Sequence, residues 1–465
     1  MNPVDVVRGT LAGTQAWLVG GTVRDELLGR SLRDIDVAVD GDPSTAARAL
    51  AHAVKGPVFR LSEAFGAWRA IDRRRGIVYD FSPLQGASID EDLAQRDFTI
   101  NAMARDVESG ELLDPHGGRA DLEARVLRVL GRRAYAEDPL RPLRLARFAA
   151  ELMFSPEPET ERLTREAAQR VPEASPERVY AELRRLLMAG GALEGVTLAD
   201  RLGVLGAVLP EVSGLHGVEQ SHFHHLDVYH HTLEVLARQI ELEGRLGELF
   251  PGSAPTLRAL LDEPLADELT RGQALRFGAL LHDIGKPATR AVRADGRVTF
   301  IGHDARGEQM VRDACRRLRT SERFSRFVEG VTRHHLVLGF LVHSRPLERA
   351  QVYRYLKTTS PVEVEVTLLS CADRLATRGR NAEAAIAAHL ELARELMAAA
   401  LEWRAAGPPR PPLRGDELAS DLGLEPGPEL GRLLACLEEA AFTGEAGTRE
   451  QAVQLARRLR HNPSP

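Results

Sequence analysis

The pattern of apolar and polar positions changes at about residue 120. Before that point, short apolar or alternating runs predict strands, and stretches with helical periodicity lie between them. The predicted order is a strand at 16–21, a helix at 22–30, a strand at 34–40, a helix at 43–54 and two strands within 67–83. A small mixed sheet covered by helices accounts for this order.

The rest of the chain has helical periodicity almost to its end. Segments rich in proline or glycine interrupt it, and one of them, at 405–415, is typical of a stiff linker. The predicted fold class is therefore α+β, with a small mixed-sheet head followed by an all-α neck, a second helical domain and a helical tail. The predicted boundaries are 1–130 for the head, 131–225 for the neck and body, 226–400 for the second domain and 411–465 for the tail.

Composition narrows the class of protein. The 465 residues are 43% apolar and 28% charged, as in soluble globular proteins, and no apolar run approaches the roughly 20 residues of a membrane span. Lysine and arginine number 61 against 67 acidic residues, so the net charge of −6 excludes a wholly basic nucleic-acid coat. Three scattered cysteines and a start without a long apolar stretch predict a cytoplasmic protein with no membrane partner.

Acidic residues near the N-terminus are candidates for metal binding. Asp34 and Asp36 lie two positions apart on a predicted strand, so both carboxylates face the same side. Two like charges held this close favour a divalent cation such as Mg²⁺, although a solvated strand edge has the same pattern. Asp80 lies among apolar neighbours, where it either completes the metal site or faces water at an edge. Two Mg²⁺ ions held in this way can promote phosphoryl transfer.

Glycine and arginine residues near these acids are candidates for binding a triphosphate. Gly20 and Gly21 follow a strand and precede a segment with Arg24, so the backbone can approach phosphate, or simply turn. Further along, RDFTINAMARD at 96–106 suggests either a clamp for ribose and phosphate or an N-capped helix.

A third candidate lies at the start of a strong helix, EDPLRPLRLARF. Asp138 and Arg141 are three positions apart and predicted to face one way. A carboxylate acceptor beside a guanidinium donor can read a base edge, and it can equally form an ion pair within the helix.

Taken in order, LVGGTVRDELLGRSLRDIDVAV, QRDFTINAMA and EDPLRPLRLARF resemble the motifs of the class II tRNA nucleotidyltransferases, the family of CCA-adding enzymes and bacterial poly(A) polymerases. This resemblance implies a nucleotidyltransferase that extends the tRNA 3′ end without a nucleic-acid template. The tRNA 3′-hydroxyl would attack the α-phosphorus of CTP, or of CTP and then ATP in the alternative of a full CCA-adding enzyme, and release pyrophosphate. Asp34, Asp36 and Asp80 would be catalytic, and the first two would hold Mg²⁺. The residues implied to bind nucleotide are Gly20, Gly21, Arg24, Arg96, Asp97, Asn101, Asp138 and Arg141.

The chain departs from the family pattern between Asp80 and Arg96. Full CCA-adding members carry a flexible segment there that contains arginine and tyrosine, whereas this chain has FSPLQGASIDEDLAQ. Members without that segment add only two cytidines, so the resemblance favours a CC-adding enzyme, with a separate partner that adds the terminal A. The alternative is that another element replaces the segment and the enzyme makes the whole CCA end.

Arginines are frequent in the predicted neck. Arg132, Arg133, Arg144 and Arg147 are candidates for contacts with tRNA phosphates, which would make binding salt-dependent. Taken singly, each of them also fits a solvated helix face.

Histidines form a second candidate site. Eleven of the fifteen histidines fall between 216 and 343, in clusters such as YHHTLEVL, ALLHDIGK, FIGHDARGEQM and TRHHL, and CADRLA follows. Imidazole and carboxylate are ordinary ligands of divalent transition metals. The order and spacing resemble the HD phosphohydrolase superfamily. This resemblance implies a transition metal or Mg²⁺ at His231, His282, Asp283 and Asp373, and a second ion at His303 and His334 (or His335).

The second resemblance implies a phosphatase or 2′,3′-cyclic phosphodiesterase that acts through a metal-activated water. An HD fold kept only as a structural body is the alternative, and the choice between His230 and His231 as ligand stays open. A rival of another class is an HD phosphohydrolase whose head only binds nucleotide. The sequence as a whole predicts a two-function enzyme of RNA 3′ ends.

Overall fold

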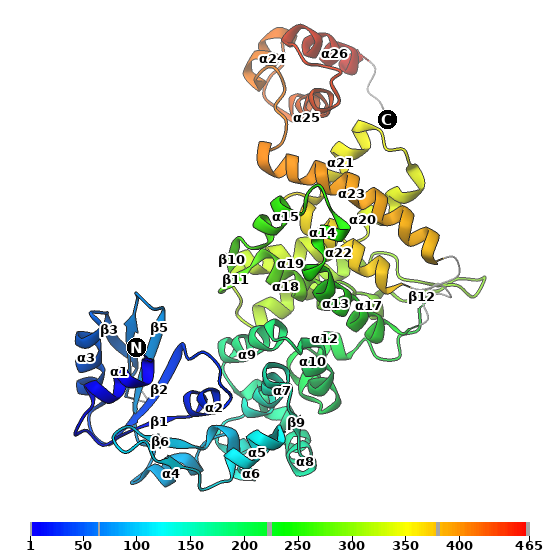
Figure 1. Cartoon of the computed structure of the whole chain (residues 1–465). Coiled ribbons are helices and arrows are strands. Elements are labelled where there is room, and N and C mark those ends of the chain that lie inside the picture. Colours follow the sequence, from blue (N-terminus) through cyan, green and yellow to red (C-terminus); the bar gives the residue numbers. More distant parts are fainter. Residues whose placement is uncertain (1, 64–65, 221–225, 378–381, 462–465) are drawn as a thin grey trace. The chain divides into compact units, whose positions relative to one another are not determined.

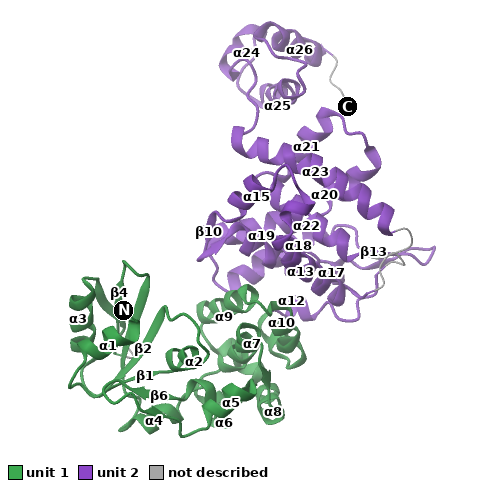
Figure 2. Ribbon diagram, in the orientation of Figure 1, with its two compact units in different colours: residues 1–208 green, residues 209–465 purple. Residues whose placement is uncertain are grey.

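The computed structural model describes residues 2–63, 66–220, 226–377 and 382–461. The chain forms two compact units, residues 1–208 and 209–465, drawn in green and purple in Figure 2. The first unit contains a seven-stranded sheet and the second is almost wholly helical, as Figure 1 shows. The predicted α+β class is therefore confirmed.

The sheet of the first unit contains β1 (Ala16–Val19), β2 (Asp34–Val39), β3 (Val58–Ser62), β4 (Ala67–Asp72), β5 (Ile77–Pro83), β6 (Ala104–Asp106) and β7 (Leu112–Leu113). The strand order is β3-β4-β5-β2-β1-β6-β7. Strands β2 and β5 are parallel, and the other neighbours are antiparallel. Asp36 is paired with Asp80 in the register of the two parallel strands.

Helices cover both faces of this sheet. On one face, α1 (Pro3–Thr10), α2 (Gly21–Leu27) and α3 (Pro43–Val54) pack against Ile35 and Val37 of β2. On the other face, α4 (Ile89–Ala94) places Leu93 against Ala38. Because side chains alternate along a strand, Asp34 and Asp36 lie on the face opposite to Ile35 and Val37.

Most elements predicted for the head are confirmed, and the helix predicted at 43–54 agrees with α3 at both ends. Strand β3 was not predicted. It lies at an edge of the sheet, and its apolar residues Phe59 and Leu61 are exposed. Its alternation spans only four residues, Phe59 to Ser62. The helix considered for 96–106 is wrong: a short 3₁₀ helix, Thr99–Asn101, runs into β6.

Helices complete the first unit, joined by a small parallel pair of strands, β8 (Val126–Leu127) and β9 (Ser155–Pro156). They are α5 (Gly118–Ala124), α6 (Arg132–Glu137), α7 (Arg141–Leu152), α8 (Pro158–Ala167), a 3₁₀ helix (Ala168–Glu173), α9 (Pro176–Met188), α10 (Ala192–Arg201) and α11 (Val204–Val208). Helix α7 packs against α9 and α10. This packing places the start of α7 beside the segment that follows α4, where Arg141 contacts the Gln95 and Arg96 carbonyls.

The second unit is built around α13 (Val228–Gly244), α16 (Arg271–Leu281), α18 (His303–Arg317), α19 (Glu322–His334), α22 (Glu363–Ala376) and α23 (Ala382–Ala406). Shorter helices surround them: α12 (Pro210–Ser213), α14 (Leu246–Leu249), α15 (Ala254–Leu261), α17 (Lys286–Thr289), α20 (Val337–Leu341), a 3₁₀ helix (Val342–Ser344) and α21 (Arg349–Thr359). Two small hairpins pair β10 (Pro264–Ala266) with β11 (Leu269–Thr270), and β12 (Ala291–Val292) with β13 (Val298–Thr299).

The C-terminal helices form a small core of their own. Leu418, Leu433 and Leu437 are fully buried between α24 (Gly415–Leu422), α25 (Pro428–Thr443) and α26 (Arg449–His461). Helix α25 is tied to α21 by polar contacts such as Lys357 with Glu438 at 2.7 Å. Over the described part of the chain, every helix is either too short or too polar to cross a membrane.

Candidate active sites

A cavity of about 580 Å³ in the first unit brings together most of the residues predicted to bind nucleotide. We call it the head cavity. Its wall is mainly charged, and acidic and basic side chains both contribute. The sequence-predicted residues that line it are Gly20, Gly21, Arg24, Asp34, Asp36, Arg96, Asp97, Asn101, Asp138, Arg141, Arg144 and Arg147.

The turn between β1 and α2 requires glycine. Gly20 has a φ of +63°, and a Cβ added there would lie 2.7 Å from Arg96 Nη1. The backbone therefore comes close to a guanidinium that faces the cavity. Arg24 on α2 is almost fully buried, and its Nη1 donates to Asn101 Oδ1 at 2.8 Å. Two of the predicted nucleotide-binding residues are thus already linked.

The carboxylates of β2 lie in a strongly negative environment. Burial, together with the nearby charges of Asp80 and Asp34, raises the pKa of Asp36 to about 6, against the lowering effect of Arg96 and Arg24. Asp34 and Asp36 both line the head cavity. A carboxylate with this raised pKa gains most from a neighbouring cation, so Asp34 and Asp36 fit a divalent metal.

Asp80 is engaged differently. Its two carboxylate oxygens accept from Arg69 Nε and Nη2, each at 2.7 Å, and this contact raises the pKa of the Arg69 guanidinium. Asp80 neighbours Asp36 in the sheet but is not among the residues that line the cavity. The negative charge of Asp80 raises the pKa of Asp36, whereas both carboxylate oxygens of Asp80 are hydrogen-bonded to Arg69.

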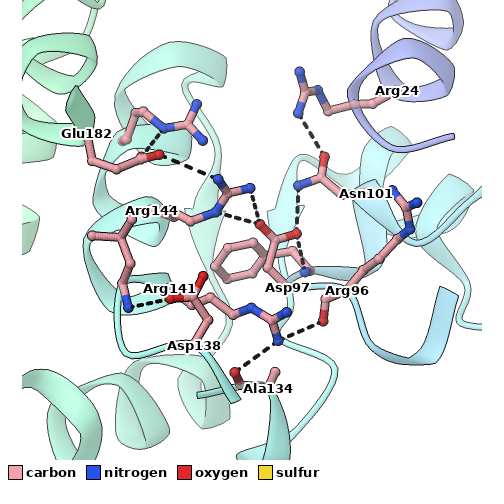
Figure 3. A network of polar contacts seen from close by, with 12 residues as sticks. Arg24, Arg96, Asp97, Asn101, Ala134, Asp138, Arg141, Arg144 and Glu182 are labelled. Atoms are coloured by element: carbon pink, nitrogen blue, oxygen red, sulfur yellow. Dashed lines mark hydrogen bonds and ion pairs between the residues drawn. The ribbon is translucent and has the colours of Figure 1, made fainter. Parts of the chain in front are cut away.

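Asp97 is the centre of a polar network at the floor of the head cavity, shown in Figure 3. It is buried and accepts from Arg144 at 2.6 and 2.9 Å, and from Asn101 Nδ2 at 2.9 Å. Burial alone would raise the pKa of Asp97, but Arg144 and the hydrogen bonds from Asn101 and the Phe98 amide outweigh it and lower the pKa. Asp97 therefore orients other side chains and is itself fully engaged.

Asp138 and Arg141 both face the head cavity but are not on one helix. Asp138 follows α6 with an extended backbone and accepts from Arg178 at 2.7 Å. Arg141 begins α7 and donates to the carbonyls of Arg96 and Ala134 (Figure 3). It also donates to the carbonyl of Gln95. The expectation of a shared helix face, and of an ion pair between these two residues, is wrong. The intervening Pro139 and Leu140 break the helix between them.

Asp92 was missed by the sequence analysis. It is almost fully buried on α4, and its Oδ2 accepts from Arg96 Nε at 3.0 Å and Nη2 at 2.8 Å. Its other oxygen accepts from the Gln85 amide at 3.0 Å. Asp92 thus fixes the guanidinium that lies across Gly20. An acid four positions before Arg96 was the available signal, because residues at that spacing meet on a helix.

The neck arginines do not form one exposed patch. Arg132 and Arg133 are at the surface and pair with Glu166 at 2.8 Å and Glu137 at 2.6 Å. Arg144 binds Asp97 in the head cavity. Arg147, also in the cavity wall, is 1% exposed and is held by Glu182 and Glu151. Arg144 and Arg147 therefore do not belong to a solvated basic face, because helix α7 turns both side chains toward carboxylates in the cavity wall.

The second cavity, of about 800 Å³, lies in the helical unit and is lined by part of the histidine cluster, including Asp283, His303 and His335. We call it the histidine cavity. Among the described residues, two groups of three ligand atoms lie within 4.8 Å of one another. The first group is His231, His282 and Asp283, and the second is Asp283, His303 and His335. Asp283 is shared by both groups, so its two oxygens can serve two ions.

The histidine rings are oriented by main-chain carbonyls. Nδ1 of His282 lies 2.9 Å from the Ala279 oxygen, and Nδ1 of His303 and His335 lie 2.7 and 2.6 Å from the carbonyls three residues before them. A carbonyl oxygen only accepts, so Nδ1 carries a proton in each ring and Nε2 is the atom that faces the cluster. Nε2 of His303 and Nε2 of His335 face each other at 3.3 Å, and His303 Nε2 lies 3.3 Å from Asp283 Oδ1. Imidazole nitrogens and a carboxylate that converge in this way fit a bound cation.

His335, rather than His334, belongs to this cluster. His335 is almost fully buried, and burial together with the nearby His282 lowers its pKa to about 3, which keeps the ring neutral. His334 is absent from both ligand groups, and its placement as a metal ligand is wrong. The chain reaches His334 at the last residue of α19, so the two rings of the His-His pair point in different directions.

His231 and Asp373 meet as predicted. His231 Nε2 lies 3.0 Å from Asp373 Oδ1 and 3.8 Å from Asp283 Oδ2. Asp373 therefore lies next to the first ligand group, not inside it. His230 is exposed, and its Nδ1 contacts Asp227 at 2.6 Å outside the cluster. Of the two histidines left open by the sequence, His231 is the one placed for a metal.

Known families match three parts of the chain. Residues 16–128 match the family described as "Poly A polymerase head domain", residues 153–215 match "Probable RNA and SrmB-binding site of polymerase A", and residues 228–378 match "HD domain". The head cavity lies mainly in the first match. The ligand groups of the histidine cavity lie within the third.

Two curated relatives match nearly the whole chain. An A-adding tRNA nucleotidyltransferase of Deinococcus radiodurans is 37% identical over 95% of both chains. A CC-adding tRNA nucleotidyltransferase of Thermus thermophilus is 35% identical over 94% of this chain and 92% of its own. A solved CCA-adding enzyme in complex with ATP has the same fold, with a TM-score of 0.65, 19% identity and coverage of 98% of this chain and 95% of its own. The chain belongs to the CCA-adding family of tRNA nucleotidyltransferases and carries an HD domain.

Proposed function

We propose that the chain adds two cytidines to the tRNA 3′ end, using CTP and Mg²⁺, and leaves the terminal A to a separate enzyme. In this reaction the tRNA 3′-hydroxyl forms a bond to the α-phosphorus of CTP while the bond to pyrophosphate breaks. Mg²⁺ would supply charge to both oxygens of that displacement. The residues that would hold it are Asp34 and Asp36, whose carboxylates face the head cavity.

The chain's own groups have distinct roles in this proposal. The backbone at Gly20 and Gly21, with Arg24 and Arg96, would receive the triphosphate. Asn101, held by Asp97, would contact the sugar. These groups are positioned before the nucleotide arrives, and that positioning reduces the entropy cost of the reaction.

The base would lie at the other side of the head cavity. Asp138 would accept from the exocyclic amino group of cytosine, and Arg141 would donate to its ring edge. Arg141 is held in place by three main-chain carbonyls, so its orientation is fixed. Arg178 occupies Asp138 at 2.7 Å and would have to yield to the base.

The observation that supports CC addition is the short connection between β5 and α4. Only residues 84–88 separate the two elements. This connection is tied down because Gln95 Nε2 donates to the Gln85 carbonyl and the Ala87 amide donates to Glu91 at 2.8 Å. A flexible segment that would reshape the base site for ATP has no place in it.

Primer extension tests this proposal. A tRNA that ends at its discriminator base is incubated with the purified chain, Mg²⁺ and labelled CTP or ATP, and products are resolved at single-nucleotide resolution. We expect two additions of C and then arrest. Efficient addition of A onto tRNA that ends in CC would overturn the CC-only specificity.

A-adding activity is the second candidate, because a relative with 37% identity carries that name. The same assay separates the two. An A-adding enzyme extends tRNA-CC with ATP and fails on tRNA that lacks both cytidines, whereas a full CCA-adding enzyme completes all three additions.

We further infer that the histidine cavity hydrolyses phosphoesters. Asp283, His303 and His335 of the second ligand group contribute to its polar part. Its apolar wall is formed by Phe300, Ile301, Leu336 and Phe340. Ile301 and Phe340 are more than 70% exposed, as expected for a surface that receives the flat ring of a nucleoside. A bound divalent metal would supply a water of lowered pKa.

Hydrolysis is tested with bis(p-nitrophenyl) phosphate and 2′,3′-cyclic nucleotides in the presence of Mn²⁺, Ni²⁺, Co²⁺ or Mg²⁺. Release of nitrophenol or nucleotide that stops on addition of a chelator supports the proposal. Absence of turnover with all four metals, in a preparation that still extends tRNA, would show that the HD fold serves only as a structural body.

A further inference from the structure

Arg374 in the histidine cavity has a charge that the surrounding protein does not balance. It lines the cavity directly after Asp373, and its Nε is buried with no hydrogen-bond partner in the described part of the chain. Two other buried or half-buried arginines of this unit are paired, Arg271 with Glu365 and Arg404 with Glu363. Arg374 has no such carboxylate among the described residues. Arg374 is half-buried, so its Nε is withdrawn from water while the side chain borders the cavity. A ligand anion that enters the cavity can supply the partner that this group lacks.

The surroundings of Arg374 place its charge inside the cavity. Its positive charge contributes to the low pKa of His389, about 4, which burial mainly causes. His389 also lines the cavity, and its Nε2 lies 3.0 Å from Ser370 Oγ. The second cation of the cavity, Lys286, is neutralised by Asp283 Oδ2 at 2.6 Å. Arg374 is therefore available to a ligand in a way that Lys286 is not.

We propose that Arg374 binds the phosphate group of the ligand in the histidine cavity, as an anion site separate from the metal-binding side chains; this rests on the proposed hydrolytic function. The planar fork of arginine matches two oxygens of a phosphate and forms charge-assisted hydrogen bonds with them. The phosphate would then lie between Arg374 and the ligand groups around Asp283. Ser370 and His389 offer further polar contacts on the same wall.

The test measures binding of inorganic phosphate to the full chain by isothermal titration calorimetry, with Mn²⁺ present. Arg374→Gln removes the charge and keeps much of the volume, and Arg374→Lys keeps a charge without the fork. Arg316→Gln is the matched control, because Arg316 lies on α18 of the same unit and is 72% exposed. The head cavity is unchanged in all three variants, so any lost binding belongs to the histidine cavity.

We expect the dissociation constant for phosphate to rise about tenfold or more in Arg374→Gln, to rise less in Arg374→Lys, and to stay constant in Arg316→Gln. The KM for p-nitrophenyl phosphate should rise with it. Circular dichroism and the melting temperature confirm that the variants are folded. Unchanged phosphate affinity in folded Arg374→Gln, or no measurable phosphate binding to the wild type, would overturn the proposal.

Two further outcomes keep the two proposals apart. If Arg374→Gln loses phosphate binding but the wild type hydrolyses no phosphoester with any of the four metals, the anion site stands and hydrolysis fails. If Arg374→Gln also loses Mn²⁺ binding, Arg374 acts by positioning Asp373, and the anion site is overturned.

Discussion

Arginines in the head cavity are balanced by carboxylates, whereas imidazoles in the histidine cavity are held by main-chain carbonyls. In the head, Arg96 is bound by Asp92 and Arg144 by Asp97. In the helical unit, His303 and His335 are oriented by carbonyls, and their Nε2 atoms face each other. Under the proposed function, the first cavity offers its guanidinium groups to a triphosphate. In the second cavity, imidazole nitrogens converge on a position that could hold a cation.

This difference has a consequence for how each cavity responds to its ligand. A triphosphate that enters the head cavity either displaces carboxylates from the guanidinium groups or binds to those N–H donors that the carboxylates leave open. In the histidine cavity the carbonyls at Nδ1 can stay bound when Nε2 takes a metal, whereas Asp283 Oδ2 would have to share with or release Lys286. Replacing one acidic residue of the head cavity should therefore change nucleotide addition only. Replacing one acidic residue of the histidine cavity should change hydrolysis only.

Asp36→Asn is expected to have the largest effect. Removing the charge of a metal-binding carboxylate should lower incorporation of CTP about 1,000-fold, because metal positioning carries the displacement. Gel analysis of single-nucleotide extension measures this loss. Asp283→Asn is the reciprocal control: it should abolish phosphoester hydrolysis and leave extension unchanged. Retained extension in Asp36→Asn would remove the metal role of β2.

His335→Gln and His334→Gln form a matched pair for the histidine cavity. His335 contributes a ring nitrogen to the second ligand group, so its loss should weaken Mn²⁺ binding about 10- to 100-fold. His334 lies outside the group and its substitution should leave the affinity unchanged. Calorimetric titration of Mn²⁺ into each variant gives both values. Equal loss in the two variants would contradict the placement of His335.

Asp92→Asn is expected to have a smaller effect on the head. The amide still accepts one hydrogen bond but no longer holds the Arg96 guanidinium by charge, so Arg96 becomes less ordered beside Gly20. We expect kcat/KM for CTP to fall about tenfold, mainly through KM. Steady-state extension assays separate the two constants. Asp90→Asn, an exposed change on the same helix, should leave both constants unaltered.

Short, continuous motifs explain why the head was largely predictable. The alternation in DIDVAV fixes two carboxylates on one face, and α3 begins at Pro43 after a capping Asp42. The exceptions depend on tertiary packing. The pairing of Asp80 with Arg69 joins two strands through a register that no local pattern specifies. Asp138 lies outside the helix, before Pro139, and its contact with Arg178 of α9 joins residues 40 positions apart.

The histidine cavity was predictable in composition but not in geometry. The residues of its two candidate ligand groups come from α13, the start of α18 and the segments that follow α16 and α19, separated by up to 104 residues from His231 to His335. Which of two neighbouring histidines faces inward depends on where a helix ends, and helix ends are the least certain feature of a sequence. Arg374 had no signal at all, since its importance lies in a missing carboxylate partner that only the packed structure reveals.

The smallest expected effect concerns the stability of the head at low pH. The pKa of Asp97 is lowered in the fold, so its ionised form contributes stability that is present above its unfolded value of about 4 and is lost as the pH falls toward the folded value. Asp97→Asn lacks this dependence. The difference in free energy of unfolding between the wild type and Asp97→Asn should therefore shrink by about 1 kcal/mol between pH 4 and pH 3. Urea denaturation at each pH measures it. A difference that stays constant or grows on acidification would show that Asp97 is not held ionised by Arg144.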